Sequence, residues 1–587
     1  MKKLKIKTAW DLGLLYQDND DPAIEADLVK AERAYDDFAK KYGGQKDYLT
    51  DESQLAAALS DYEQLEALAP AKPLLFFHYQ THLDSKNSAA EAKVNLLSQR
   101  LDKVTNKIIF FPLGLSKISK DKQAEYLKSE ILIKWRYFLK VIFDHSQYLL
   151  SEPEEKLFNL LSLPAHALWV KGNEKNVSGQ EVKWRGKTLP LAEALGKISA
   201  LPTRDRRALH TATIEKLKGV ADFAESELNA VVISKKISDE LRGYANPYEA
   251  TVLGYQNERA TVDNLVATVT DNFAISHRFY RLKAKLLGLR RLTYADRSAA
   301  VGKTRQKISF GQAVEIIRRA FAKVSPIYTE TFDEFLRRGQ IDVFPKTGKH
   351  GGAYCSSYAN LPTFILLNHL PDFRSVTTLA HELGHAFHSK FSFENQPPFY
   401  RDYTTAAAEV ASTLFENFVF DEVFSTLSAK EKIVALHDKI NGSVQTIFRQ
   451  IACFNFEVAL HTAIRARGAL SKTEIAALMN AHMSAYLGPI FKLHPDDGYF
   501  FVYWSHLRQF FYVYSYAFGE LVSNALYSRY QADKKFEVKI RQFLSAGGSA
   551  SPENIFASIG LDVRHPEFFK LGLQKIEEDI AKLEDLV

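Results

Sequence analysis

Cysteine is nearly absent from this sequence, which has only Cys355 and Cys453 in 587 residues. Two isolated cysteines can form one disulfide at most, and a single cysteine at each place cannot build a cysteine-based zinc site. So little cysteine is typical of proteins that work in a reducing compartment. We therefore expect a cytoplasmic protein.

Long apolar runs are missing as well. No stretch of about 18 consecutive apolar residues occurs, so no transmembrane helix is predicted. The lysines near the N-terminus are followed by Asp11 and Asp18 before any apolar segment of secretory length. We expect no membrane partner.

A large excess of one charge is also lacking, because the formal net charge is only +6 over the whole chain. No basic tail and no long run of lysine and arginine is present, so nucleic-acid binding is a poor interpretation. The hydrophobic content of 46% is ordinary for a globular protein. The length suffices for two or more domains or for one large two-lobed body.

Helical spacing of apolar residues dominates the chain. We expect helices at 21–43, 50–69, 88–111, 151–161, 204–240, 261–287, 312–339, 404–425, 430–466, 472–485, 506–531 and 564–585. Residues 170–189 break this pattern with three glycines and predict a hairpin or an irregular loop. Residues 341–368 contain three strand-like pieces. The sequence predicts a mainly α fold with a small sheet, divided into a helical N-terminal lobe at 1–190 and a second domain at 191–587.

The strongest chemical signal is HELGH at residues 381–385, an instance of the motif H-E-x-x-H. In a helix, His381 and His385 lie one turn apart on one face, so both imidazoles can bind one Zn²⁺. Glu382 is rotated by about 100° around the axis. Its carboxylate therefore lies beside the metal, where it can accept a proton from a water that the zinc activates. The alternative is a chance match, in which a buried histidine pair makes ordinary hydrogen bonds.

His388 follows the motif on the same helical face. It lies about 10.5 Å along the axis from His381, too far for the two to share one zinc. A pair of His385 and His388 is sterically possible but would leave Glu382 without a role. We interpret His388 as a residue that packs against the metal ligands or orients them.

A catalytic zinc usually has three protein ligands and one open position. Glu409 is the favoured third ligand, because the small residues around it let the predicted helix 404–425 pack closely and antiparallel against the motif helix. Glu394 and Asp402 are weaker candidates in the intervening loop. A glutamate near a helix N-terminus is also favoured by the helix dipole alone, which is the alternative for Glu409. Glu416 either orients a ligand histidine or is a solvated charge.

These residues belong to a wider set of motifs. The chain is similar to the oligoendopeptidase F family, relatives of thimet oligopeptidase and neurolysin, over nearly its whole length. The motifs are WDLGLLY at 10–16, GGAYCSSY at 351–358, TLAHELGHAFHS at 378–389, AEVASTLFE at 408–416, FRQIACFNFEVALH at 448–461, HLRQFFYVYSYAFG at 506–519 and LSAGGSASPENIFASIGLDVRHPEFF at 544–569. Many families share the zinc motif, whereas this combination is specific.

The resemblance implies a neurolysin-like fold, which is a two-lobed helical body with a deep substrate channel and a small sheet beside the zinc helix. It implies an endopeptidase with one zinc per chain that hydrolyses short, unstructured oligopeptides. Residues 191–587 would be its catalytic domain. The resemblance also supports Glu409 as the third ligand.

The family further implies residues that bind the substrate. A GGAY strand is expected to pair with the substrate backbone, or else to form a simple hairpin turn, and it consists of Gly351, Gly352, Ala353 and Tyr354. His506, Tyr512 and Tyr514 are expected over the scissile carbonyl, where a phenol can donate a hydrogen bond to the developing oxyanion. Of these, Tyr514 and His506 are favoured for the role, and Tyr512 is the alternative donor. Alternatively, these aromatic side chains belong to the core.

Three functions stay open from the sequence. The first is a zinc endopeptidase, and the second is a zinc carboxypeptidase of related helical fold. The third is a peptide-binding zinc protein without turnover, which Glu382 disfavours because binding alone needs no base. The sequence makes no prediction of oligomeric state.

Overall fold

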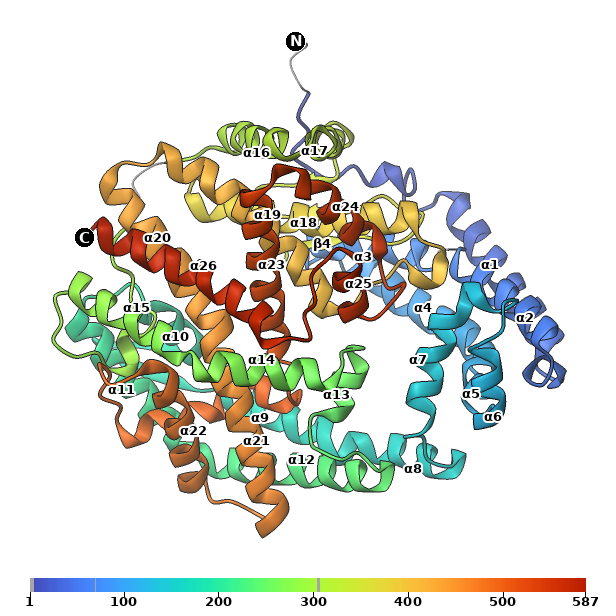
Figure 1. Ribbon diagram of the computed structural model, residues 1–587, viewed down its shortest axis with the longest axis horizontal. Helices are drawn as coiled ribbons and strands as arrows, with labels where there is room; N and C mark the ends of the chain where they lie inside the picture. Colours follow the sequence, from blue (N-terminus) through green and yellow to red (C-terminus); the bar gives the residue numbers. More distant parts are fainter. Residues whose placement is uncertain (1–4, 69, 304–306) are drawn as a thin grey trace. The chain divides into compact units, whose positions relative to one another are not determined.

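The computed structural model describes residues 5–68, 70–303 and 307–587 (Figure 1). Most of these residues are helical, and the strands in these ranges form a two-stranded and a three-stranded sheet. The predicted class, mainly α with a small sheet, is confirmed. None of the helices in the described ranges combines the length and the apolar content that a membrane crossing requires.

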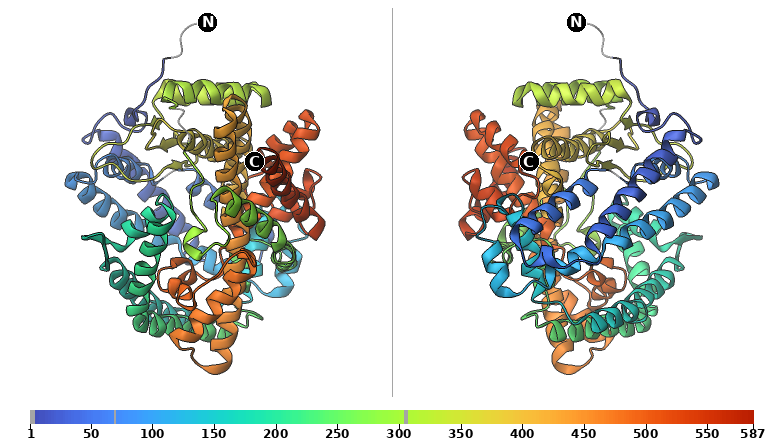
Figure 2. Two further views of the ribbon diagram at one scale, coloured as in Figure 1. Left: turned by 90° about the vertical axis from the view of Figure 1, so that its left-hand side faces the viewer. Right: turned by 90° about the vertical axis from the view of Figure 1, so that its right-hand side faces the viewer.

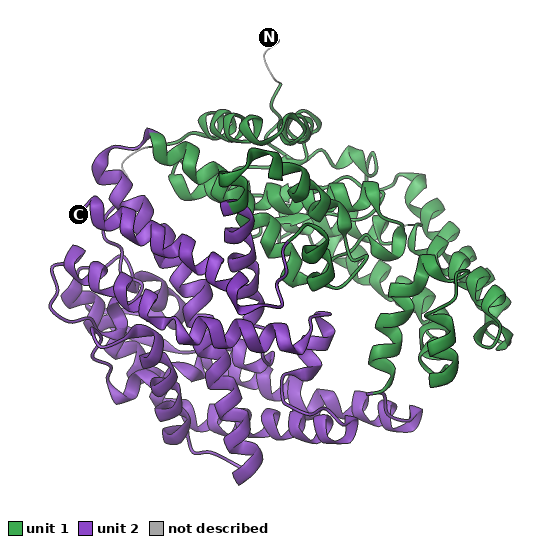
Figure 3. Cartoon of the chain, viewed as in Figure 1, with its two compact units in different colours: residues 1–147, 306–425, 529–560 green, residues 148–305, 426–528, 561–587 purple. Residues whose placement is uncertain are grey.

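The chain forms two compact units, which Figure 3 colours separately. Unit 1 comprises Met1–Gln147, Gln306–Ser425 and Arg529–Gly560, and unit 2 comprises Tyr148–Arg305, Thr426–Ser528 and Leu561–Val587. Each unit therefore combines three separate stretches of sequence. The predicted domain boundary at residue 190 instead divides the chain into two continuous stretches. That boundary stays a prediction.

Unit 1 is built from helices around the three-stranded sheet. Its helices are α1 (Pro22–Tyr42), α2 (Glu52–Glu66), α3 (Lys72–Leu83), α4 (Ser88–Thr105), α5 (Phe110–Ser116), α6 (Lys120–Tyr126), α7 (Arg136–Ser146), α16 (Phe310–Val324), α17 (Pro326–Arg338), α18 (Phe373–Asn395), α19 (Thr405–Thr426), α24 (Glu537–Ala546) and α25 (Pro552–Ser558). Its strands are β3 (Ile341–Asp342), β4 (Tyr354–Ser356) and β5 (Phe364–Leu366).

The described residues of unit 2 form helices and one β-hairpin, joined by turns and loops. Its elements are α8 (Glu152–Ser162), α9 (Leu168–Ser178), β1 (Glu181–Trp184), β2 (Lys187–Pro190), α10 (Leu191–Ile198), α11 (Thr203–Gly219), α12 (Ala221–Arg242), α13 (Glu249–Gly254), α14 (Arg259–Asp271), α15 (Phe273–Leu286), α20 (Ala429–Ser443), α21 (Arg449–Arg467), α22 (Lys472–Leu487) and α26 (Pro566–Asp585). Helix α23 (Tyr514–Ala532) begins in unit 2 and ends in unit 1. Figure 2 gives two further views of these elements.

Several predicted helices match closely. The predicted helix at 430–466 is present as α20 and α21, which a π-helical turn at Val444–Phe448 joins into one run. The predicted hairpin within 170–189 is present as β1 and β2. The first half of that region was predicted wrongly as loop, because α9 continues through it to Ser178.

The prediction of one helix over 506–531 was wrong at its beginning. Residues Ser505–Arg508 form a short 3₁₀ turn, and α23 starts only at Tyr514. Phe510 and Phe511 adopt φ angles of 52° and 62°. These left-handed conformations are incompatible with a continuing right-handed helix.

The three-stranded sheet has the order β3-β5-β4, in which β3 and β5 are parallel and β4 is antiparallel to β5. The indole of Trp10, in the motif WDLGLLY, donates a hydrogen bond to the Ile365 carbonyl at 2.8 Å. Its ring also packs edge-on against Phe364. Strand β4 contacts α18. The predicted small sheet beside the motif helix is therefore present.

Helices α18 and α19 approach each other unusually closely at Gly384. A Cβ added there would lie 2.6 Å from the Cα of Ser412 and 2.8 Å from the carbonyl oxygen of Ala411. His388, later in α18, stacks on Tyr403 just before α19, so the two helices run antiparallel. This is the close antiparallel packing that the small residues of α19 predict.

Replacing Gly384 by alanine should therefore force the two helices apart. We expect Gly384→Ala to lower the free energy of unfolding by about 1–3 kcal/mol, as overpacked core substitutions do. The matched control is Gly311→Ala in the first turn of α16, where an added Cβ has nothing within 4 Å. Thermal and denaturant unfolding of both variants would measure the difference. Equal stability of the two would contradict the close packing.

Candidate active site

The H-E-x-x-H motif lies in the middle of α18. Asp372 caps this helix, accepting a hydrogen bond from the Ser375 N–H at 2.8 Å. His381 and His385 project from one face, with their Nε2 atoms 3.2 Å apart. Their rings meet almost perpendicularly, at an angle of 83°. With this geometry, the Nε2 atoms of both rings can bind one ion placed between them.

Glu409 reaches the same point from α19. Its Oε2 atom lies 3.8 Å from Nε2 of His381, and the Ser412 hydroxyl donates to that oxygen at 3.2 Å. Among the described residues, His381, His385 and Glu409 form the one group of three whose potential ligand atoms all lie within 4.8 Å of one another. Two histidines of α18 and one glutamate of α19 thus converge on one point.

The three side chains fit a zinc ion. Two imidazoles and one carboxylate are a known donor set for catalytic zinc, and they leave a fourth position open. Tetrahedral bonds of about 2.0–2.1 Å place neighbouring ligand atoms about 3.3 Å apart. The separations of 3.2 Å and 3.8 Å in this structure are close to that value.

Glu416 orients the first histidine. Its Oε1 atom lies 2.5 Å from Nδ1 of His381. A proton on Nδ1 then leaves the lone pair of Nε2 directed at the convergence point. Burial alone would lower the pKa of His381, but the bond and charge of Glu416, with Glu382 and Glu409, raise it to about 9. The surroundings of this ring thus favour positive charge.

Glu382 is a buried carboxyl beside the histidines, 6% exposed. Burial raises its pKa to about 7, and the charges of Glu409 and Glu416 act in the same direction, while His381 opposes them. The backbone of Cys355, in β4, lies close enough to this carboxyl to act against the rise of its pKa. A carboxyl with a pKa near neutrality is suited to accept and release a proton.

His385 and His388 differ in their surroundings. Burial, with a contribution from His381, lowers the pKa of His385 to about 3, which keeps its ring neutral. His388 lies flat against Tyr403, with ring centroids 3.5 Å apart, and it also contacts Phe543 of α24. It therefore packs behind the ligands. Its spacing in the helix indicated this position, whereas nothing in the sequence pointed to Tyr403.

The alternative ligands lie elsewhere. Glu394 is inside the last turn of α18, not in the following loop as predicted, and it pairs with Lys390. Asp402 is in the loop between α18 and α19 and is absent from the metal-ligand group.

The GGAY segment has mixed structure. Tyr354 begins β4, and Gly351, Gly352 and Ala353 form the turn before it. Gly352 has a φ of 80°, which favours glycine. The amide of Asn368 donates to the Gly352 carbonyl at 2.8 Å and holds the turn. Within the described residues, the outer edge of β4 is unpaired.

The predicted carbonyl-binding residues all lie in unit 2. The Tyr512 hydroxyl forms a short hydrogen bond with Nδ1 of His506, and both side chains are partly exposed. Tyr514 is fully buried, and its hydroxyl donates to the Asn257 side chain at 3.0 Å. The structure thus pairs His506 with Tyr512 and directs Tyr514 elsewhere. The sequence did not reveal Asn257 as a partner.

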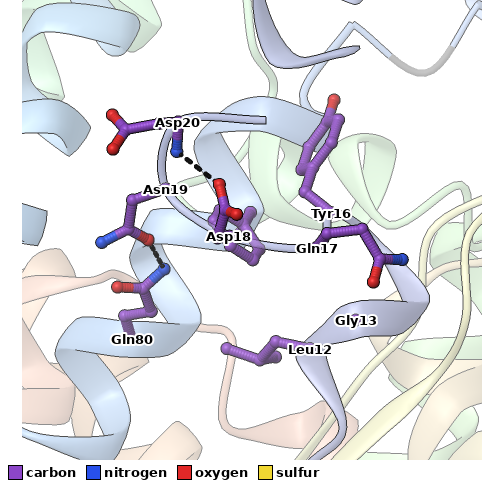
Figure 4. Close-up of a pocket in the computed structure, with 9 residues that line it drawn as sticks. Leu12, Gly13, Tyr16, Gln17, Asp18, Asn19, Asp20 and Gln80 are labelled. Carbon is purple, nitrogen blue, oxygen red and sulfur yellow. Dashed lines mark hydrogen bonds between the residues drawn. The ribbon is translucent and has the colours of Figure 1, made fainter. Parts of the chain in front are cut away.

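A pocket of about 410 Å³ occurs in unit 1 between the chain before α1 and helix α3 (Figure 4). The Gln80 amide donates to Asn19 at 2.7 Å, and the Asp20 N–H donates to Asp18 at 2.9 Å. Its polar groups bond to one another, and none of its lining residues belongs to the metal-ligand group. It offers no catalytic arrangement.

Comparisons with known proteins agree with the motifs. The family model of peptidase family M3 matches residues 202–574, and that of oligopeptidase F matches residues 115–179. Group B oligopeptidase PepB of Streptococcus agalactiae is 25% identical over 99% of this chain and 97% of its own length.

Solved structures show the same fold. A Chlamydophila abortus protein assigned as a peptidase superposes with a TM-score of 0.88 at 23% identity, covering 99% of this chain and 98% of its own. Oligoendopeptidase-F of Enterococcus faecium superposes with a TM-score of 0.69 at 19% identity, covering 96% of this chain and 99% of its own. The resemblance to oligoendopeptidase F is confirmed. This chain belongs to peptidase family M3.

Proposed function

We propose that this M3 peptidase is a zinc-dependent endopeptidase that hydrolyses short, unstructured oligopeptides in the cytoplasm. The observation that carries the proposal is the convergence of His381, His385 and Glu409 beside the buried carboxyl of Glu382. The name of the similar Streptococcus agalactiae protein, an oligopeptidase, supports the class of substrate.

The residues of unit 1 have separate roles in the proposed reaction. His381, His385 and Glu409 would hold the zinc, and Glu416 would orient His381. Zinc bound there would supply Lewis-acid activation of water and of the peptide carbonyl. Glu382 accepts the proton of the attacking water at its carboxylate and then donates it to the leaving amine.

Two groups of unit 2 would stabilise the developing oxyanion. We assign this role to His506 and Tyr512, which are partly exposed and hydrogen-bonded to each other. Tyr512 is preferred to Tyr514, because the Tyr514 hydroxyl is buried and already donates to Asn257. A phenol positioned before the reaction needs no reorganisation when negative charge develops.

The substrate backbone would pair with the open edge of β4 and with the GGAY turn that leads into it. Gly351 and Gly352 permit a close approach of another backbone. Strand β4 contacts α18, and the backbone of its Cys355 influences the pKa of Glu382, so this strand runs beside the proposed general base. Strand addition would bring the scissile bond to the metal ligands.

Zinc content should follow the ligand assignment. The purified protein should contain about one zinc per chain, and Glu409→Ala should lose most of it because a third ligand is removed. Glu416→Gln should keep the three ligands but bind zinc about 10- to 100-fold more weakly. Glu394→Gln, at a glutamate paired with Lys390, is the control and should be unchanged. Metal analysis of a chelator titration would measure this. Full zinc content in Glu409→Ala would require another third ligand.

Endopeptidase activity should be visible on a peptide of about ten residues with an amidated C-terminus. Mass spectrometry should show internal cleavage by the wild type, which a carboxypeptidase would not produce. Glu382→Gln should retain zinc and peptide binding while turnover falls by about 10²–10⁴-fold, because the amide cannot accept a proton. Removal of single C-terminal residues from a free peptide, without internal cleavage, would favour the carboxypeptidase. Binding without cleavage would favour the peptide-binding protein.

The two tyrosines should respond differently to loss of their hydroxyls. Tyr512→Phe should lower kcat by about 10²–10³-fold with little change in KM, as expected for a donor that acts in the transition state. Tyr514→Phe removes the bond to Asn257 and should lower stability by about 1–3 kcal/mol, with a much smaller change in kcat. Steady-state kinetics and thermal unfolding would separate the effects. The opposite pattern would return the catalytic role to Tyr514.

A further inference from the structure

The turn at Phe510–Phe511 is a conformational anomaly next to the His506–Tyr512 pair. Both phenylalanines have positive φ angles, 52° and 62°. Left-handed backbone is unfavourable for bulky residues and persists only where the surroundings enforce it. The next residue is Tyr512, whose hydroxyl bonds to His506. Whatever holds this turn therefore also sets the position of Tyr512.

Glu457 of α21 holds the turn through a hydrogen bond to its backbone. Its Oε1 atom accepts a hydrogen bond from the Phe511 N–H at 2.9 Å, and the side chain is fully buried. The Thr251 hydroxyl donates to the Phe510 carbonyl at 3.0 Å. The ring of His461, one helical turn beyond Glu457, packs against Phe511 at 4.7 Å. The turn is thus fixed by two hydrogen bonds and by ring packing.

His506, the other member of the pair, lies in a turn that is fixed by separate contacts of Arg508. Arg508 is buried and forms a two-pronged ion pair with Glu227 of α12, at 2.9 and 2.7 Å. Its Nη1 atom donates to the carbonyls of Phe501 and Trp504. This clamp accounts for the 3₁₀ turn that carries His506. It leaves the Phe510–Phe511 turn to Glu457 and its neighbours.

A purely structural role explains Glu457 poorly. A buried carboxyl loses its hydration, which is unfavourable unless its oxygens are well paired. Only Oε1 has a hydrogen-bond partner in the part of the chain that is described, and Oε2 has none. Burial accordingly raises the pKa of Glu457 to about 8. An apolar side chain would fill this place without the free-energy penalty of a dehydrated carboxyl. The single bond to Phe511 is therefore the feature that requires a glutamate.

We propose that Glu457 is a positioning residue for catalysis, which fixes the Phe510–Phe511 turn through the Phe511 N–H and thereby holds Tyr512 against His506. The inference rests on the proposed function, in which Tyr512 and His506 stabilise the oxyanion that develops at the peptide carbonyl. Glu457 itself touches no substrate. It acts by keeping the donor pair in place before the substrate arrives.

The test compares three substitutions of Glu457. Glu457→Met has a similar length but no acceptor, and it should lower kcat by about 10- to 100-fold, the scale of a misplaced catalytic group, with KM within about twofold. Glu457→Asp keeps the carboxylate but shortens its reach, and it should lower kcat as well. Glu457→Gln keeps an acceptor oxygen at the same reach and should retain most of the activity. Steady-state kinetics on the amidated peptide measures all three.

A double substitution tests whether Glu457 acts through Tyr512. If it does, Glu457→Met should add little to the loss already caused by Tyr512→Phe. Hydrogen exchange of the peptide covering residues 509–513 gives a readout that does not depend on activity. Its amides should lose protection in Glu457→Met and keep it in Glu457→Gln.

A matched control separates positioning from general destabilisation. Asp296 is another fully buried carboxylate of unit 2, paired with Arg206 and Arg207. Asp296→Asn should lower the melting temperature while kcat and the exchange of residues 509–513 stay at wild-type values. Zinc content should be unchanged in every variant.

The outcomes distinguish this inference from the proposed function. Wild-type kcat in a folded Glu457→Met variant, together with a reduced kcat in Tyr512→Phe, would overturn the inference alone. A full additional loss in the Tyr512→Phe background would also overturn it. If Tyr512→Phe had no effect, the proposed role of Tyr512 would fail and the inference with it. Absence of peptide cleavage by the wild type would reject the proposed function, and the exchange experiment would then still decide whether Glu457 holds the turn.

Discussion

The close approach of α18 and α19 is the constraint on which the candidate metal site depends. Gly384 has no side chain, so the backbone at Ser412 comes nearer than any Cβ would allow. At this separation, Glu409 and Glu416, seven residues apart on one face of α19, both reach His381. Glu409 approaches Nε2, and Glu416 bonds to Nδ1. One helix therefore supplies a candidate ligand and also orients a candidate ligand histidine of the other helix.

The close packing of α18 and α19 also brings several negative charges together around the two histidines. Three carboxyls surround two imidazoles. Their charges raise the pKa of His381 against the effect of burial, and they add to the burial that raises the pKa of Glu382. A divalent cation between the rings would offset these charges and would favour the ionised form of Glu382. Metal binding and readiness of the general base would then be coupled, because both depend on the carboxylates that α19 brings to α18.

The sequence was most informative where chemistry imposes a fixed spacing. The i, i+4 histidines, the adjacent glutamate and the small residues around Glu409 were sufficient to predict the close helix pair and the proximity of His381, His385 and Glu409. Helical periodicity failed at 506–513, because apolar spacing contains no information about backbone φ angles at Phe510 and Phe511. It also could not reveal how the surroundings of Tyr512 and Tyr514 differ, and the resemblance favoured Tyr514. That difference depends on Asn257, which is far away in sequence and enters only through tertiary packing.

The segment between Trp504 and Tyr514 shows why such packing matters for chemistry. Glu227 and Glu457 reach it from α12 and α21, and each bonds to a different part of it. Burying these acidic groups is unfavourable by itself, and the bonds that they make to this segment hold it in one conformation. A hydrogen-bond donor contributes most to catalysis when it is oriented before charge appears on the substrate, because the cost of ordering has then been met during folding. The same histidine and tyrosine on a flexible loop would offer identical chemistry but would have to be ordered again in every turnover. In the proposed reaction, two buried acidic side chains on separate helices would remove that step.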